Sequence, residues 1–226
     1  MINVPFKSVG RDGYMLNSEF AAKGMTASDD SATSDQLQYW DAETSGYDIF
    51  WYYEGDSSEA EYPEGWYNFT TGEKFEKDYP DGFTPGTPFW YLSIGDAELS
   101  ATDLGAVPEE ASYTFPIVKG NFNMVGSPYP GCFSLNNKIT VLNGTLSDDS
   151  ATSDQMQFWN PVTSGYELFW YFEGDPSDEA YPAGWYSFES GEKFEADYPK
   201  GFTSTKPCWY FALGIGTGSI TFAKPY

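Results

Sequence analysis

The sequence predicts an all-β protein made of two tandem duplicated domains, each an antiparallel β-sandwich or a barrel-like fold. Three observations predict this. The polar phrase SDDSATSDQ occurs at residues 28–36 and returns unchanged at residues 147–155. Short segments whose side chains would alternate between two faces of a strand are separated by clusters of Gly, Pro, Asn, Asp and Ser, as in strands joined by turns. No segment shows the apolar stripe of an amphipathic helix.

The duplication extends well beyond this phrase. At one constant offset, residues 28–94 match residues 147–213 without a gap. This offset is too long for a solenoid or propeller repeat and fits a whole domain. Upstream, residues 14–20 align with residues 123–129, which leaves the segment around residue 132 without a counterpart in the first copy. Residues 112–115 resemble residues 219–222. We therefore expect one domain at residues 1–116 and another at residues 117–226.

The strands follow from side-chain alternation. In the segment 47–54, YDIFWYYE, the residues alternating from Tyr47 to Tyr53 are expected to face the core and those from Asp48 to Glu54 the water. The second copy keeps this pattern, so Trp51 and its counterpart Trp170 are expected in equivalent core positions. Further strands are expected at residues 35–40, 65–69, 88–94, 112–118, 122–127 and 138–142.

The repeated phrase has two interpretations. Asp and Ser side chains bond nearby backbone N–H groups, so the phrase suits a tight turn before a strand. Its carboxylates also offer the hard oxygen ligands that calcium prefers, although the spacing differs from an EF-hand. Calcium is therefore the one cofactor that the sequence suggests. The candidate ligands are Asp29, Asp30 and Asp35 in the first copy and Asp148, Asp149 and Asp154 in the second.

The chain is strongly acidic, with 34 acidic and 11 basic residues and a net charge of −23. Nucleic acid is an unexpected partner, because phosphates are bound by basic patches. No apolar run is long enough for a transmembrane helix. Aromatic residues make up 19% of the chain, with many Ser, Thr and Gly. This composition is typical of a secreted β-protein, although adaptation to high salt is a competing cause of the acidity.

Two cysteines and two glycosylation patterns bear on the compartment. Cys132 lies in the segment that the first copy lacks and Cys208 replaces Phe89, so both thiols belong to the second copy alone. Gain or loss as a pair predicts a Cys132–Cys208 disulfide and an oxidising compartment. The alternative is two unrelated buried thiols. Asn68 and Asn143 each begin an Asn-x-Thr pattern for N-glycosylation.

No catalytic signature is present. The chain has no His, which excludes His-dependent catalytic triads and His-containing metal sites. With so many acidic residues, no single carboxylate pair stands out for glycoside hydrolysis. We therefore expect no enzymatic activity. Exposed aromatic rings beside polar groups can stack on sugars. The candidates, which border the polar turns, are Trp40, Trp66, Trp159 and Trp185.

The segments of the second copy resemble a known repeat when read in order. NFNMVGSPYP, SDQMQFWN, GYELFWYFEG, GWYSF and KPCWYFALG are similar to a tandem repeat of large exported proteins in Planctomycetes–Verrucomicrobia–Lentisphaerae type bacteria. The likeness covers the second copy from residue 120 to about residue 222, and the first copy lacks the Pro-Tyr-Pro element. The family has no defined function. The resemblance implies export and an extracellular or cell-surface location.

These observations together predict a non-enzymatic structural or adhesive protein of the cell exterior, built as a subunit of a filament or surface assembly. Both chain ends read as strands, at residues 2–9 and 219–226, so strand addition between copies would give a head-to-tail homo-oligomer. The alternative is a glycan-binding module that uses exposed Trp and Tyr.

Overall fold

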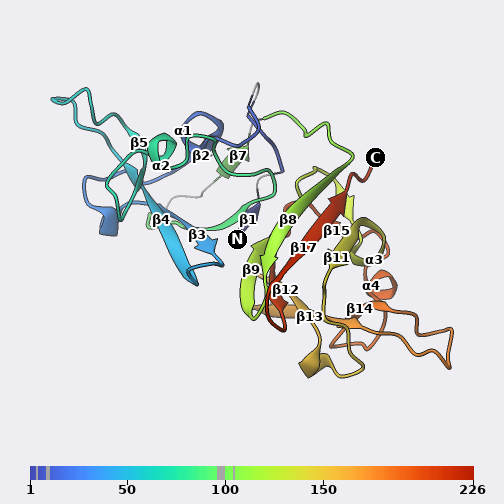
Figure 1. Ribbon diagram of the computed structural model, residues 1–226. Coiled ribbons are helices and arrows are strands. Elements are labelled where there is room, and N and C mark those ends of the chain that lie inside the picture. The colour runs from blue at the N-terminus through green and yellow to red at the C-terminus, as the bar shows by residue number, and fades with distance from the viewer. Residues whose placement is uncertain (4, 9–10, 96–99, 104) are drawn as a thin grey trace.

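The computed structural model describes residues 1–3, 5–8, 11–95, 100–103 and 105–226, and it confirms the all-β prediction (Figure 1). The first half builds a five-stranded sheet in the order β1-β6-β3-β4-β5, and the second builds one in the order β14-β13-β12-β16-β9. Read from the opposite edge, the second order repeats the first. The strands of the first sheet are β1 (Ile2–Asn3), β3 (Gln36–Asp41), β4 (Gly46–Tyr53), β5 (Gly65–Asn68) and β6 (Pro88–Leu92). Those of the second are β9 (Asn121–Val125), β12 (Gln155–Asn160), β13 (Gly165–Phe172), β14 (Gly184–Ser187) and β16 (Cys208–Ala212).

Smaller sheets and short helical turns cover one face of each large sheet. β2 (Phe20–Lys23) pairs with β7 (Ser100–Asp103), while β11 (Ile139–Leu142), β17 (Thr217–Ala223) and β8 (Ser112–Val118) form a three-stranded sheet, and β10 (Cys132–Phe133) pairs with β15 (Phe202–Thr203). The helical turns are α1 (Leu16–Glu19), α2 (Phe75–Asp78), α3 (Leu135–Lys138), α4 (Phe194–Asp197), η1 (Ser31–Thr33) and η2 (Ser150–Thr152). The strand pairings are antiparallel and none of the sheets formed by the described residues closes into a barrel, which leaves the sandwich as the architecture. None of the helices in this part of the chain could span a bilayer.

Strand register extends the constant offset in both directions. Phe20 pairs with Asp103, and at the same offset Ile139 pairs with Phe222. The bridge between Tyr14 and Phe83 likewise corresponds to the pairing of β10 with β15. The alignment of residues 14–20 with residues 123–129 is therefore wrong, because α3 and β11 are the counterparts of α1 and β2. No segment is inserted around residue 132.

Residues 112–115 and 219–222 resemble each other in sequence, but they are not equivalent positions of the two copies as the sequence suggested. These two segments are not equivalent strands but direct partners, because β8 pairs with β17 over its whole length and Thr114 stands opposite Thr221. The two threonine hydroxyls are 2.8 Å apart. The junction expected after Pro116 falls inside β8, whose pairing joins it to the second half.

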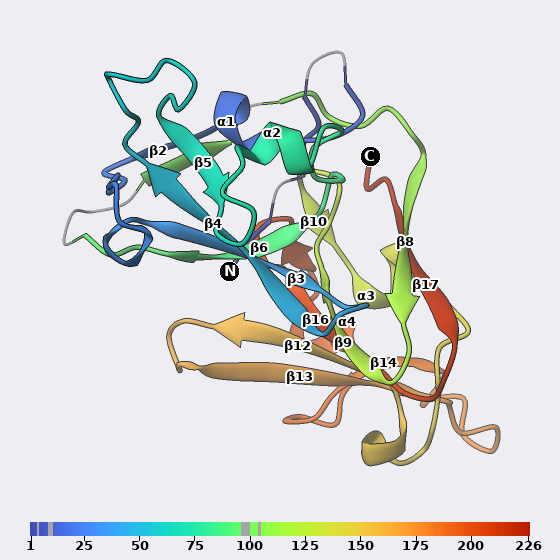
Figure 2. The ribbon, with the colours of Figure 1, turned by 60° about the vertical axis from the view of Figure 1, so that its left-hand side comes forward.

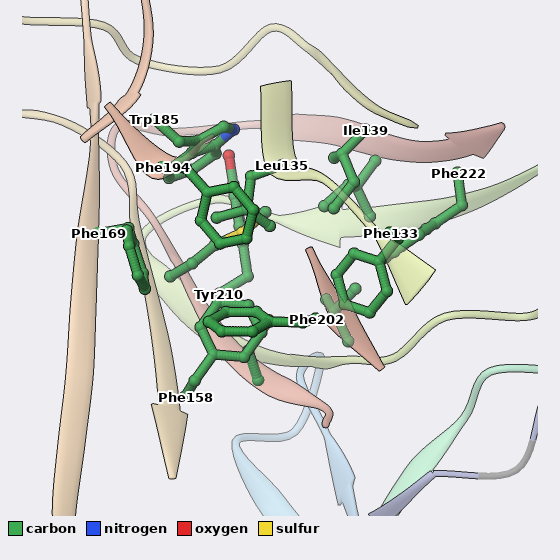
Figure 3. Close-up of a cluster of buried hydrophobic side chains, with 14 of the residues drawn as sticks. Phe133, Leu135, Ile139, Phe158, Phe169, Trp185, Phe194, Phe202, Tyr210 and Phe222 are labelled. Carbon is green, nitrogen blue, oxygen red and sulfur yellow. The ribbon is translucent and has the colours of Figure 1, made fainter. Parts of the chain in front are cut away.

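Each half has its own aromatic core. Figure 3 shows the core of the second half, where Phe158 and Phe169 from the large sheet pack in one cluster with Ile139 and Phe222 from the smaller sheet. The corresponding cluster of the first half includes Phe50. Complete burial of each such ring contributes about 1.5–3 kcal/mol. The large sheet, the small sheet and the helical turns therefore hold together mainly by burying one shared layer of rings.

The faces of the long strands are opposite to those expected. Phe50 is fully buried, whereas Tyr47 is 42% exposed, and in the second half Phe169 and Tyr166 behave in the same way. Trp51 and Trp170 accordingly lie on the outer face and not in the core. Alternation could not decide the matter because both faces carry large apolar residues. Each of these strands has one polar residue near its start on the core-facing side, Asp48 in the first half and Glu167 in the second, and it stands at the rim of the core.

The two halves are joined by the first strand as well as by the connecting chain (Figure 2). The Asn3 side chain is buried, and its Nδ2 donates to the carbonyls of Ser127 at 2.8 Å and Ser204 at 2.7 Å. β1 pairs with β6, and the C-terminal strand β17 pairs with β11 and β8. Both terminal strands thus already have partners inside the chain, contrary to the free strand ends on which the expected strand addition depended.

Candidate functional site

The outer faces of the two large sheets meet through four tryptophans. The rings of Trp40 and Trp209 lie 5.6 Å apart and nearly perpendicular, and those of Trp90 and Trp159 lie 6.4 Å apart at 75°. Trp40 is the counterpart of Trp159, and Trp90 that of Trp209, so the same contact is made twice with the roles exchanged. Reciprocal contacts of this kind define a two-fold interface. The halves therefore pack as the subunits of a homodimer do.

Hydrogen bonds from β9 hold this interface in place. The Trp40 indole donates to the carbonyl of Phe122 at 2.8 Å. Asn121 Nδ2 reaches the turn between β3 and β4, where it donates to the carbonyl of Ala42 at 2.8 Å and to the Ser45 hydroxyl at 2.5 Å. Because β9 is longer than its counterpart β1, these bonds have no symmetric equivalent among the described residues. They join the two halves directly, and a cleft lies beside the tryptophan contact.

This cleft has a volume of about 290 Å³ and is lined almost entirely by aromatic side chains. Its lining residues are Trp40, Tyr47, Phe122, Gln157, Tyr166 and Trp209. Tyr47, Phe122 and Tyr166 are among the exposed large apolar side chains of the protein. Both halves contribute to the lining, so the cleft exists only because the two sheets are packed face to face. We refer to it as the interface cleft.

Three of the residues that line this cleft carry polar groups, although its surface is almost wholly apolar. Gln157 offers a carboxamide with two donors and an acceptor, and Tyr47 and Tyr166 each offer a phenol. Burial raises the pKa of Tyr47, the neighbouring Tyr166 adds to the rise, and an indole hydrogen bond from Trp90 opposes it. The Tyr47 phenol is therefore neutral at physiological pH and can both donate and accept. Ring faces with hydroxyl and amide groups beside them suit a ligand that is apolar on its faces and polar at its rim.

The four tryptophans that the sequence suggested for sugar stacking are a different set from the four at the interface, and the structure divides them into two pairs. Trp66 and Trp185 are fully or almost fully buried in the cores, so stacking on a ligand is excluded for them. They belong to the strands β5 and β14, whose residues are buried on both faces. Trp40 lines the interface cleft, and Trp159 packs against Trp90 and Tyr166 at the same interface. Trp40 is therefore placed at the cleft itself, and Trp159 lies beside it at the interface without lining it.

The repeated phrase forms a turn held by its own side chains. Asp30 Oδ1 accepts from the Ala32 N–H at 2.9 Å, and Ser28 Oγ accepts from the Asp30 N–H at 3.0 Å. The Thr33 hydroxyl lies 2.8 Å from that of Ser28. The second copy repeats these bonds around Asp149, at 2.9 Å to the Ala151 N–H. A turn that uses so many side chains explains why the phrase is identical in both copies.

The expected calcium ligands do not converge. Asp35 is buried beneath the turn, while Asp29 and Asp30 are exposed above it. Asp148 and Asp149 are likewise exposed, and Asp154 is buried. Within the described residues no group of three Asp, Glu or Cys side chains is placed to hold a metal ion. The two buried carboxylates have another role.

Each buried carboxylate connects the turn to the strand of its large sheet that comes last in the chain, β6 in the first half and β16 in the second, and to the residues that follow it. Asp154 Oδ2 accepts from the Thr145 N–H at 3.0 Å and from the Tyr210 hydroxyl, and its Oδ1 accepts from the Leu213 N–H at 2.7 Å. Burial raises the pKa of Tyr210, and the negative charge of Asp154 adds to the rise. Asp35 makes the matching set of bonds in the first half. These aspartates are structural anchors whose oxygens are already satisfied.

The expected disulfide is absent. Cys132 is exposed at the edge pair β10–β15, whereas Cys208 is buried in the core of the second half, and both thiols are free. The inference failed because Cys132 does not lie in an inserted segment. It takes the place of Gly13, as Cys208 takes that of Phe89, so the two substitutions are separate. Burial raises the pKa of the Cys208 thiol, which keeps it protonated and unreactive.

The two glycosylation patterns differ in accessibility. Asn68 is buried, and its Oδ1 accepts from the backbone N–H groups of Thr70 at 2.8 Å and Thr71 at 3.2 Å, which caps the turn after β5. Asn143 is exposed after β11 with φ 60°. Only the second pattern presents its carboxamide at the surface.

Sequence reasoning missed the residues that complete the cleft and one repeated anchor. Tyr47 and Tyr166 were assigned to the core, and Trp209 was not considered. Asn17 and Asn136 were also missed, although each side chain bonds the main chain of a buried tryptophan; Asn136 Oδ1 accepts from the Trp185 N–H at 2.7 Å. The signal was available, since both asparagines follow leucine at the same offset as the rest of the repeat.

No protein-family model matches the chain, and neither a curated protein nor a solved structure matches it.

Proposed function

We propose that the chain is a non-enzymatic adhesive module of the cell exterior that binds neutral glycans in the interface cleft. The observation that carries the proposal is the cleft itself, where aromatic side chains from both halves form an almost wholly apolar lining. Its volume of about 290 Å³ lies just below the range of typical ligand pockets, which is roughly 300–1,000 Å³. A site of this size holds a short stretch of a sugar chain while the rest of the chain extends into water.

Charge narrows the class of glycan. The net charge of −23 repels anionic ligands, which disfavours sulfated and uronic-acid-rich chains. Neutral hexose-based oligosaccharides carry no such penalty, and their C–H faces stack on aromatic rings. The location outside the cell rests on the composition and on the resemblance to exported repeats. The free thiols remove the disulfide as a further argument for an oxidising compartment.

A glycan array followed by titration of the best neutral oligosaccharide would test this proposal. Tyr166→Ala should weaken binding about tenfold or more, which corresponds to about 1.4 kcal/mol. Tyr181 provides a matched control, since it is also exposed and does not line the cleft. Absence of binding to every neutral glycan, or an equal loss in Tyr181→Ala, would refute the assignment.

The filament predicted from the sequence stays a prediction. A terminal strand could join a second copy only after it leaves β6, or after it leaves β11 and β8. Sedimentation of the full chain at high concentration and salt would show whether such exchange takes place.

A further inference from the structure

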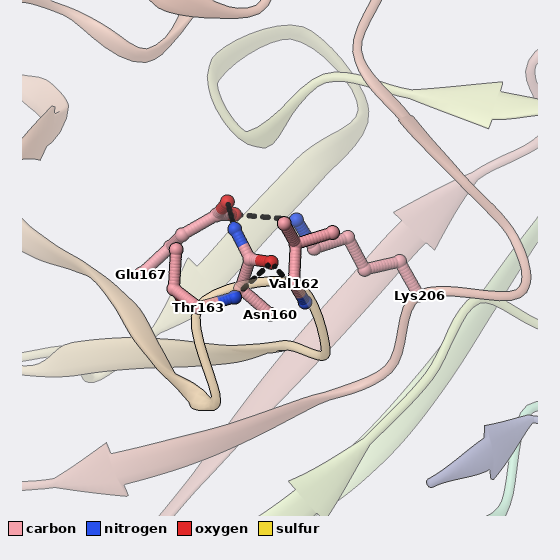
Figure 4. A network of polar contacts seen from close by, with 5 residues as sticks. All are labelled: Asn160, Val162, Thr163, Glu167 and Lys206. Carbon is pink, nitrogen blue, oxygen red and sulfur yellow. Dashed lines mark hydrogen bonds and ion pairs between the residues drawn. The ribbon is translucent and has the colours of Figure 1, made fainter.

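A lysine, a glutamate and an asparagine meet at the rim of the second core (Figure 4). The Lys206 ammonium forms an ion pair with Glu167 Oε2. Asn160 Nδ2 donates to the other oxygen of the same carboxylate, Oε1, at 2.8 Å. One carboxylate therefore holds an amine and a primary amide side by side. Neither the glycan site nor the anchors described above involve these three residues.

The three side chains come together at one end of the large sheet. The pairing of β12 with β16 ends at Phe158 opposite Cys208, so Asn160 follows this last pair on β12, and Lys206 precedes β16 in the turn after β15, where its N–H donates to the Thr203 carbonyl at 3.0 Å. Glu167 lies on the neighbouring strand β13, opposite Phe158. The amine and the amide are therefore neighbours through their shared contact with the Glu167 carboxylate.

The surroundings of the ion pair are partly shielded from water. The side chains of Lys206 and Glu167 are 25% and 20% exposed. Lys206 Nζ lies 4.1 Å from the centre of the Phe202 ring, and the rings of Phe158 and Tyr198 border it. Shielding from water strengthens the electrostatic contacts of the carboxylate.

The amide oxygen of Asn160 is held by two backbone donors. Its Oδ1 accepts from the N–H of Val162 at 2.9 Å and from that of Thr163 at 3.4 Å. Fixed N–H donors aimed at a carbonyl oxygen stabilise the negative charge that develops there when the carbon is attacked. The group that could take up a proton, Glu167, stands on the opposite side at the amide nitrogen. The amide is thus polarised at its oxygen and contacted by a carboxylate at its leaving group.

We propose that Lys206 and Asn160 become joined by an intramolecular isopeptide bond, with Glu167 as the catalytic acid–base. Glu167 accepts a proton from the Lys206 ammonium, and the neutral amine attacks Asn160 Cγ. The Nζ–Cγ bond forms, the Cγ–Nδ2 bond breaks, and the protons released from Nζ pass through Glu167 to the departing nitrogen. The leaving group is ammonia, released as ammonium, so charge balances and no oxidant or cofactor is needed.

The first half of the chain supplies an internal comparison. Asp41, Asp48 and Thr87 occupy the places of Asn160, Glu167 and Lys206, so the first half has neither the amine nor the amide. Asp41 still holds the turn after β3, because its Oδ1 accepts from the Glu43 N–H at 2.8 Å. A carboxylate is therefore sufficient for the turn. The amide and the lysine of the second half are additions that the fold itself does not need.

High-resolution intact mass of the purified full chain tests the proposal. The wild-type protein should be lighter than its sequence by one ammonia. The variants Glu167→Gln and Lys206→Arg should both have the full calculated mass, while Lys200→Arg, which changes an exposed lysine outside the cluster, should keep the loss. Peptide mapping should give a cross-linked pair of peptides containing Asn160 and Lys206. Circular dichroism would verify that each variant is folded. If Glu167→Gln does not fold, the mass of Lys206→Arg, which keeps the positive charge, tests the proposal alone.

Two results would overturn the proposal. One is a wild-type protein of full calculated mass after prolonged incubation at neutral pH. The other is an ammonia loss that persists in Lys206→Arg or that maps elsewhere, for example to a succinimide at Asn143, which precedes Gly144. A succinimide gives the same mass change but no cross-linked peptides.

Discussion

Replacement of Asp35 by alanine should destabilise the first half severely. The carboxylate is completely buried and accepts from the Ile94 N–H at 2.8 Å, from the Thr26 N–H at 3.2 Å and from the Tyr91 hydroxyl. Hydrogen bonds to a charged group contribute about 1.5–3 kcal/mol each, and their simple sum overstates the loss because water and side chains rearrange. Breaking a buried charged network costs about 3–5 kcal/mol, and we expect Asp35→Ala to fall in this range.

Asp29→Ala is the matched control, since Asp29 is an exposed residue of the same turn. Surface substitutions of this kind change stability by about 0.5 kcal/mol or less. Urea unfolding followed by tryptophan fluorescence, in chelator and again in millimolar calcium, would measure both variants. The anchor interpretation predicts a large effect of Asp35→Ala alone and no effect of calcium. Equal losses in the two variants, or a stabilisation by calcium that either variant removes, would refute it and support a calcium loop.

Three further predictions follow from buried contacts. Cys132 should react rapidly with a thiol reagent in the native protein and Cys208 only after unfolding, with no mass change on reduction; a single reduction-sensitive species with no free thiol would contradict this. Asn3→Ala should cost about 1–3 kcal/mol by leaving two buried carbonyls unpaired, and should expose the chain between the halves to limited proteolysis. The raised pKa of Tyr210 means that its contribution to stability is complete below about pH 10, the ordinary pKa of tyrosine, and is lost as the pH rises above it. Burial and the nearby carboxylates of Asp48 and Asp35 raise the pKa of Tyr79 and Tyr91 in the same way, so absorbance at alkaline pH should show several tyrosines that ionise only with unfolding, and a Tyr210→Phe variant should show one fewer.

The fold class and the duplication could be predicted from the sequence because strands and turns leave local signals. The repeated phrase marks a turn that satisfies its own backbone, and such a turn tolerates little change. The limits of the match could not be found in the same way. At the ends of the repeat few residues are identical, and only the register of Phe20 with Asp103 and of Ile139 with Phe222 reveals that the offset continues. Register depends on pairing between distant segments, which identity alone does not report.

The prediction of which strand face is buried was wrong for a physical reason. Alternation identifies a core face only when the other face is polar. Here Tyr47 stands on an outer face that is covered in part by the other half of the protein, where Trp40 contacts Trp209, while Trp51 on the same face packs against Tyr67. A sheet packed on both sides carries apolar residues on both sides. The sequence therefore predicts the strand but not which of its two faces is turned toward the core. The interface cleft was missed for the same reason, because its residues were assigned to the core.

The comparison of the two halves separates what the fold requires from what one half has gained. The buried anchors Asp35 and Asp154 and the reciprocal tryptophan contacts are the same in both halves, and each has partners that a substitution would leave unpaired or unpacked. The cluster around Glu167 differs, although Asp48 holds the equivalent place. It stands at the end of strands, where a side chain can change without disturbing the core. The proposed isopeptide bond thus falls where the two halves differ, since Asp41, Asp48 and Thr87 of the first half stand in the places of Asn160, Glu167 and Lys206.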